Sequence, residues 1–137
     1  MGMELEVLKQ MIESDPFFKM LGIKVEKIGH GSCIISLKFT EELTRFGGVL
    51  NGGATATLAD AAGGCAALSY RLGKNEVTVD LAVSYLRTIS SGPVTAESSV
   101  VKGGSSLAFT LTNIRDGQGR LCATANGTYF YLDDFNI

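Results

Sequence analysis

The chain has 137 residues, of which 45% are hydrophobic and 19% are charged, and its formal net charge is −2. This balance is typical of a folded domain that buries its own core, and it excludes a largely disordered chain. No run of basic residues is present, so nucleic acid is not expected as a partner, because phosphate binding needs clustered Lys and Arg. We therefore predict a single domain over residues 1–137.

The sequence also predicts a soluble, cytoplasmic protein with no membrane partner. The N-terminus is charged and amphipathic, unlike a signal peptide, and the apolar stretch at 47–70 is too glycine-rich to span a bilayer. Cys33, Cys65 and Cys122 are odd in number and form no CxxC pair, so we interpret them as reduced thiols that fill the core. No group of residues has the spacing of metal ligands.

Residues 1–20 are predicted to form a helical segment. Apolar residues recur at helical spacing over 3–13, which predicts a short amphipathic helix. A second short helix is predicted to begin at Pro16, directly after Asp15, because proline is favoured in the first turn of a helix.

Alternating apolar residues then predict a hairpin over 23–39, with the sequence Gly-His-Gly at 29–31 as its turn. His30, the only histidine, is therefore interpreted as a turn residue. Further alternation predicts four more strands, at 77–85, 93–103, 105–116 and 119–132. In the first of these, five apolar side chains are predicted to share one face: Val77, Val79, Leu81, Val83 and Tyr85.

A long central helix is predicted at about 51–70, between the second and third strands. Gly63 and Gly64 each cost roughly 1 kcal/mol relative to Ala inside a helix. Such glycines indicate either the close approach of another backbone or a small-residue helix that is pressed tightly into a curved sheet. Consecutive strands on tight turns are antiparallel, so the predicted fold class is α+β: an antiparallel sheet wrapped around one long helix.

The central helix contains a single charged residue, Asp60, whose burial without a partner would cost several kcal/mol or a proton. It lies nine residues after Asn51, a rise of roughly 13 Å and half a turn off the same face. One chain therefore does not bring its Asp60 to its own helix start, whereas two chains with antiparallel helices do so twice. This spacing predicts a homodimer or a homotetramer. The alternative is a structural Asp60 whose carboxylate accepts hydrogen bonds from a neighbouring hydroxyl such as that of Thr57, or from backbone donors.

Two segments, "GGVLNGGATATLADAAG" and "VTVDLAVSYLR", resemble the hotdog-fold acyl-CoA thioesterases, most closely the phenylacetate-degradation type, and the resemblance covers residues 20–131. It implies a hotdog fold and hydrolysis of acyl-CoA thioesters to a free acid and CoA, with no cofactor beyond the CoA of the substrate. Asp60 falls at the family's catalytic carboxylate. Thr78 falls at a Ser/Thr position that helps to hold the attacking water. The chain has Asn51 where the family usually has His, and Arg45 where it commonly has Asn.

The residues at the helix start are suited to stabilise a thioester oxyanion. The N–H groups of Gly52 and Gly53 lack intrahelical partners and carry partial positive charge, and no side chain blocks their approach to a carbonyl. Asn51 is predicted either to cap the helix or to orient a substrate group. Arg45 is a candidate donor to the thioester carbonyl or to a carboxylate on the acyl group.

Arg87 and Lys102, with Lys74, are candidates for the phosphates of CoA, because phosphates are bound by Lys and Arg. A solvated surface is the alternative for each of them. Two other functions remain open. Hydration or dehydration of acyl thioesters is disfavoured, because His30 offers no His–acid pair. A non-catalytic acyl-CoA-binding or regulatory hotdog domain is the main alternative to the thioesterase.

Overall fold

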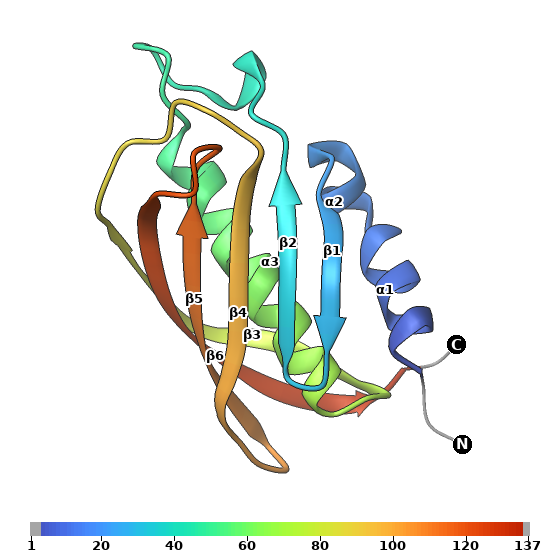
Figure 1. Ribbon diagram of the computed structural model, residues 1–137. Coiled ribbons are helices and arrows are strands. Elements are labelled where there is room, and N and C mark those ends of the chain that lie inside the picture. The colour runs from blue at the N-terminus through green and yellow to red at the C-terminus, as the bar shows by residue number, and fades with distance from the viewer. Residues whose placement is uncertain (1–3, 136–137) are drawn as a thin grey trace.

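The computed structural model describes residues 4–135 as an antiparallel six-stranded sheet that wraps around one long helix, α3 (Figure 1). The strand order is β1-β2-β4-β5-β6-β3, so β3 forms one edge. The elements are α1 (Leu5–Glu13), α2 (Pro16–Leu21), β1 (Lys24–Gly29), β2 (Ser32–Leu37), the 3-10 helix η1 (Glu41–Leu43), α3 (Gly52–Tyr70), β3 (Lys74–Tyr85), β4 (Val94–Gly103), β5 (Leu107–Arg115) and β6 (Leu121–Asp134). The predicted α+β architecture and the order of its elements are confirmed.

The two short N-terminal helices that the sequence predicted are present, and α2 begins at Pro16. The Asp15 side chain accepts the N–H groups of Phe17 and Phe18 and so caps α2. Helix α1 lies along β1 (Figure 1) and buries Leu8 and Ile12. None of the helices within residues 4–135 is long and apolar enough to cross a membrane.

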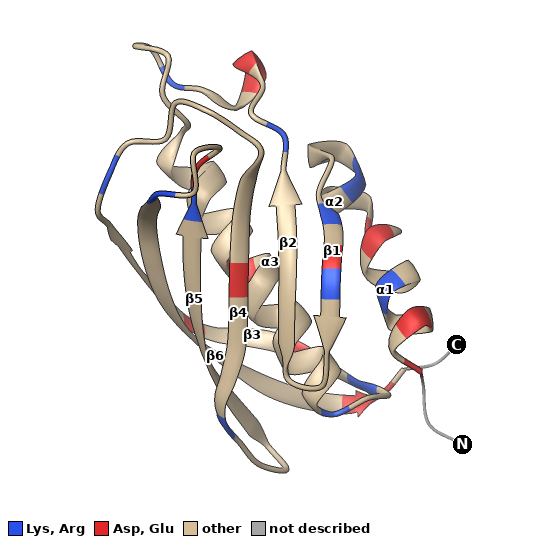
Figure 2. Ribbon diagram, viewed as in Figure 1, with Lys and Arg blue, Asp and Glu red and all other residues tan. Residues whose placement is uncertain are grey.

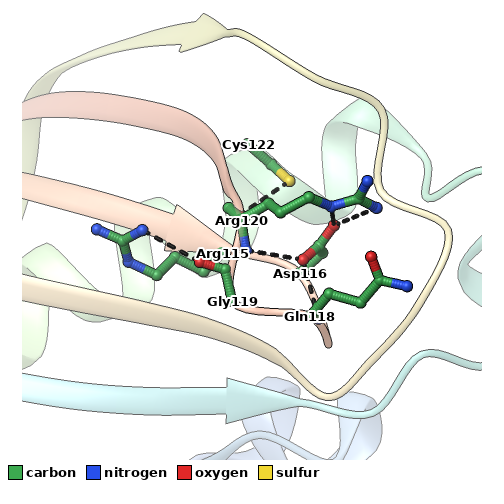
Figure 3. Close-up of polar contacts among 6 residues, drawn as sticks. All are labelled: Arg115, Asp116, Gln118, Gly119, Arg120 and Cys122. Atoms are coloured by element: carbon green, nitrogen blue, oxygen red, sulfur yellow. Dashed lines mark hydrogen bonds and ion pairs between the residues drawn. The ribbon is translucent and has the colours of Figure 1, made fainter.

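The predicted hairpin turns are also confirmed, and the β5–β6 turn contains an ion pair between the buried Asp116 and the partly exposed Arg120 (Figure 3). Asp116 accepts the backbone N–H groups of Gln118 and Arg120, each at 3.0 Å, and pairs with the Arg120 guanidinium at 2.9 Å. Burial alone would raise the pKa of the Asp116 carboxyl, but these hydrogen bonds lower it below its ordinary value. Gly119 adopts a φ of 79°, which other residues rarely adopt.

One prediction about β3 is wrong, because a β-bulge reverses the face of the sheet to which the side chains after it point. Val77 pairs with Phe130 on the outer face of the sheet, whereas Leu81 pairs with Gly127 on the face that covers α3. The register shifts between Thr78 and Asp80, so one extra residue separates the two halves of the strand. The five apolar residues from Val77 to Tyr85 therefore do not share one face.

The glycines of α3 make room for side chains of the sheet. A Cβ atom on Gly63 would overlap the Tyr129 hydroxyl, and one on Gly64 would lie 3.1 Å from Oε1 of Glu76. Of the two readings of these glycines, the tightly packed small-residue helix is therefore the one observed. The three cysteines are free and buried, as expected.

Candidate active site

Asp60 lies on the third turn of α3, half-buried against the inner face of β3 and β6. Its Oδ1 accepts hydrogen bonds from Oγ1 of Thr78 at 2.8 Å and from the Tyr129 hydroxyl at 3.2 Å. Oδ2 accepts none from residues 4–135, and Asp60 lines a cavity. The carboxylate is thus oriented by two hydroxyls through one oxygen, and the other oxygen remains available to a water molecule or a substrate.

Tyr129 is the second residue that holds Asp60, and the sequence analysis did not identify it. Its ring packs between Gly63 and Gly127, where any larger residue would collide with it. Burial and the negative charge of Asp60 both raise the pKa of the Tyr129 hydroxyl. The phenol therefore keeps its proton at neutral pH and serves as a donor to Asp60.

The cavity beside Asp60 has a volume of about 270 Å³ and lies between α1, α2, α3 and the start of β3. Most of its walls are apolar, from Leu8, Met11, Ile12, Phe18, Cys65, Leu68 and Phe135. This volume is near the lower limit for small-molecule pockets, so it suits an acyl group rather than a whole acyl-CoA.

A second acidic residue, Glu76, enters this cavity from β3, next to Gly64 and one helical turn beyond Asp60. Burial, and then the charge of Asp60, raise the pKa of Glu76 to about 7. Its carboxyl is therefore partly protonated at neutral pH. The sequence offered one signal for it, the unexplained Gly64, but did not show which side chain fills the space.

At the start of α3 the structure leaves one backbone donor available. Oδ1 of Asn51 accepts the Gly53 N–H at 2.7 Å, so Asn51 is an N-cap and the Gly53 N–H is engaged. The Gly52 N–H has no acceptor within residues 4–135. Tyr85 donates its hydroxyl to the carbonyl oxygen of Gly52 at 2.7 Å. Gly52 therefore presents an N–H donor at the positive end of the helix.

Arg45 and Arg87 both line a second cavity of about 350 Å³, together with Gly52 and Tyr85. Arg45 stacks on the exposed ring of Phe46, with its guanidinium carbon 4.1 Å from the ring centre. Two guanidinium groups beside a helix start form a setting that favours phosphate or carboxylate groups.

The remaining candidates lie elsewhere. Lys102 pairs with Phe109 on the outer face of the sheet, and Lys74 forms an ion pair with Asp134 at 3.0 Å. Gly52 and Asp60 lie eight residues apart in the same helix, a rise of about 12 Å, so one chain does not bring them together. No group of three potential metal ligands occurs among the residues that the structure describes.

Comparisons with known proteins identify the family of this chain and match its fold. The sequence profile of the Thioesterase superfamily matches residues 47–123. Acyl-coenzyme A thioesterase 13 of Homo sapiens is 33% identical over 126 residues, 90% of this chain and 90% of that protein. A protein of Thermoplasma acidophilum, provisionally named an esterase, is 36% identical over 125 residues, 91% of this chain and 95% of its own length. The solved structure of a Haemophilus influenzae thioesterase has a TM-score of 0.85 at 26% identity and covers 97% of this chain and 93% of that one.

Proposed function

The chain belongs to the thioesterase superfamily and has its hotdog fold, and we propose that it hydrolyses acyl-CoA thioesters to a free acid and CoA. The observation that carries this proposal is the free Oδ2 oxygen of Asp60, whose carboxylate is oriented by Thr78 and Tyr129 at the end of an acyl-sized cavity.

In the proposed reaction the carbon–sulfur bond of the thioester breaks and a carbon–oxygen bond to water forms. Asp60 either takes a proton from the attacking water or attacks the carbonyl carbon itself, after which water hydrolyses the resulting anhydride. Negative charge develops on the carbonyl oxygen, and the Gly52 N–H of the partner subunit stabilises it. Water is the second reactant, so the reaction needs no cofactor.

The proposed site is complete only in a dimer. Strand β3 is an edge strand of 12 residues with an exposed backbone edge, and such an edge in a soluble protein is usually paired or covered. Pairing of two β3 strands in antiparallel fashion extends the sheet across both subunits and sets the two α3 helices antiparallel. Each Asp60 then faces the helix start of the other subunit.

The two cavities divide the substrate between them in this arrangement. The apolar cavity beside Asp60 takes the acyl group, and the cavity with Arg45 and Arg87 takes phosphates of CoA. The volume and apolar lining of the first cavity support the acyl assignment, and the positive charge of the second supports the phosphate assignment.

The test is the release of free thiol from a panel of short aliphatic, medium aliphatic and aromatic acyl-CoAs, followed with a thiol-reactive dye. Thiol release that is proportional to enzyme concentration is expected for at least one of these esters. Acyl-CoA binding without release would instead support the non-catalytic binding domain. Light scattering on the same sample should give at least twice the 14.5 kDa chain mass, and a monomer would contradict the shared site.

A further inference from the structure

Three tyrosines of the sheet hold helix α3 through their hydroxyl groups, and each donates to a different backbone carbonyl of the helix. The three bonds run from Tyr85 to Gly52 at 2.7 Å, from Tyr129 to Asp60 at 3.1 Å and from Tyr131 to Ala67 at 2.6 Å. Their acceptors lie at the start, in the middle and near the end of α3. The sheet therefore holds the helix at three points along its length.

The bond from Tyr85 differs from the other two in its surroundings. Tyr129 and Tyr131 are 0% and 5% exposed, whereas Tyr85 is 55% exposed. The loss of a buried hydrogen bond leaves a buried carbonyl unsatisfied, whereas water readily replaces an exposed one. The Tyr85 bond thus adds little to the stability of the fold, yet Tyr85 and Gly52 line the same cavity of the proposed site.

The backbone around Gly52 shows what this bond does. The peptide group that follows Gly52 is held on both sides: its C=O accepts the Tyr85 hydroxyl, and its N–H donates to Oδ1 of Asn51 at 2.7 Å. The peptide group that precedes Gly52 is held through the Asn51 carbonyl oxygen, which accepts the Ala54 N–H at 2.9 Å. Of the polar groups in these two peptides, only the Gly52 N–H has no partner within residues 4–135.

Two glycines make such support necessary. Gly52 and Gly53 have no side chain that restricts their backbone, so a helix that begins with them frays readily. A Cβ atom on Gly52 would lie 3.7 Å from the Tyr85 ring, so the ring lies directly against this residue. The ring and the hydroxyl of Tyr85 together hold a residue whose own backbone preference is weak.

The cavity beside Tyr85 favours an oxygen that becomes negative. Figure 2 shows positive charge in the loop after η1 and in the connection from β3 to β4, and Arg45 and Arg87 of these segments line the cavity. Figure 2 also shows acids on η1, but none of the residues within 4–135 that line this cavity is acidic. The stabilisation of an oxyanion beside Gly52 therefore depends on the direction of its N–H.

We propose that Tyr85 is a positioning residue for hydrolysis, whose hydroxyl holds the Gly52 carbonyl and so fixes the direction of the Gly52 N–H. This inference rests on the proposed function, in which that N–H stabilises the oxyanion. Donors that are fixed in advance act without reorganisation at the moment of reaction. Strand β3 then positions both halves of the site, since Thr78 of the same strand donates to Asp60.

Tyr85→Phe tests this role, because it keeps the ring against Gly52 and removes only the hydroxyl. The kcat of thiol release is expected to fall about five- to fiftyfold, since a small misplacement of a reacting group costs up to about a hundredfold. The thermal midpoint should hardly change, because the lost bond is exposed.

Tyr131→Phe is the matched control, because it removes a phenol–carbonyl bond of similar length to the same helix. Tyr131 is buried and lines neither cavity of the proposed site. This variant should therefore lower the thermal midpoint more than Tyr85→Phe does and leave kcat within about twofold of wild type. The two variants are thus expected to show opposite patterns of activity and stability.

A binding measurement tests the position of the N–H without turnover. Two CoA thioethers are compared: one carries a methyl ketone, which stays trigonal, and the other a trifluoromethyl ketone, which forms a tetrahedral hydrate that resembles the transition state. Tyr85→Phe should weaken binding of the trifluoromethyl ketone at least about fivefold and of the methyl ketone less than about twofold. Tyr131→Phe should weaken neither.

Three results would overturn the inference. An unchanged kcat in Tyr85→Phe would leave Tyr85 as a structural residue, as would a loss of stability with full activity. An equal loss of affinity for both ketones would place Tyr85 in ground-state binding instead. A wild-type protein that hydrolyses no acyl-CoA and binds both ketones equally would contradict the proposed function, and this inference with it.

Discussion

Substitution of Asp60 by Asn tests the proposed chemistry most directly, because the structure separates the two oxygens of this carboxylate. An Asn side chain retains an oxygen that accepts the hydrogen bonds from Thr78 and Tyr129. Its amide nitrogen replaces Oδ2, the oxygen that accepts no hydrogen bond from residues 4–135, and this nitrogen neither accepts a proton nor attacks a carbonyl. The change therefore removes the reactive group and preserves the contacts that hold it.

The expected loss in kcat is about a hundred- to ten-thousand-fold, the usual range for a missing general base, and corresponds to about 3 to 5 kcal/mol of transition-state stabilisation. Stability should not fall. The charge of Asp60 raises the pKa of Glu76, so its removal relieves a repulsion between two acids in the same cavity. The free energy of unfolding of Asp60→Asn is therefore expected to equal or exceed that of wild type at neutral pH.

Three measurements on one preparation are needed: the thermal midpoint, the affinity for a non-hydrolysable acyl-CoA analogue, and kcat by thiol release. Binding is expected to survive, because the helix-start N–H and the arginines are unchanged. Asp133→Asn, at an exposed position near the end of β6, is the matched control and should behave as wild type. An Asp60→Asn protein that is destabilised but fully active would refute the catalytic role and assign Asp60 to structure.

Three further substitutions test other parts of the site. Asn51→Ala should lower kcat/KM about ten- to a hundred-fold while Asn51→His is tolerated, and an unchanged kcat/KM in Asn51→Ala would make Asn51 a helix cap only. The pKa of Glu76 is raised from 4.5 to about 7, so between these two pH values the native state binds more protons than the unfolded state. The free energy of unfolding of wild type should therefore fall as the pH rises from 4.5 to about 7. Glu76→Gln should lack this fall, which amounts to at most about 3 kcal/mol. If the thermal midpoints of wild type and Glu76→Gln changed in parallel with pH, the raised pKa of Glu76 would be contradicted. Gly63→Ala should cost about 1–3 kcal/mol by urea unfolding and should displace Tyr129, whereas Gly104→Ala, where a Cβ has open space, should be neutral.

The sequence predicted the elements whose signals are local. The start of α2 at Pro16, the glycine turns and the alternating strands each depend on residues that are adjacent in the chain, so they could be placed before the structure was known. The bulge in β3 could not, because Val77 and Val79 continue the same alternation as Leu81 and the extra residue changes no residue type. The position of the bulge depends on the register of β3 with β6, two strands that are far apart in the chain.

The same division applies to the candidate site. The unusual charge of Asp60 and the resemblance of its surroundings were sufficient to select it and Thr78, which the structure joins by a hydrogen bond. Tyr129 and Glu76 were missed, since their approach to α3 depends on how the sheet curves. The two central glycines signalled that something comes close, but only the packed sheet shows that it is a phenol and a carboxyl.

The opposite charges of the two cavities should determine which acyl groups the proposed enzyme accepts. Among residues 4–135, the acyl cavity is lined by the carboxyl groups of Asp15, Asp60 and Glu76 and by no cationic side chain, whereas Arg45 and Arg87 line the other cavity. An acyl chain that ends in a carboxylate would bring a further negative charge among these acids, and like charges in such a site disfavour binding. Hexanoyl-CoA should therefore be hydrolysed at least about ten times more efficiently than adipoyl-CoA, which has the same number of acyl carbons.

Protonation of Glu76 below its pKa of about 7 removes one of the opposing charges. The ratio of the kcat/KM for hexanoyl-CoA to that for adipoyl-CoA should therefore be smaller near pH 6 than near pH 8. At pH 8 the same ratio should be smaller in Glu76→Gln than in wild type. Hydrolysis of both esters with a ratio that neither pH nor Glu76→Gln changes would show that the acyl chain does not lie beside Glu76, and hydrolysis of neither would place the failure in the proposed function itself.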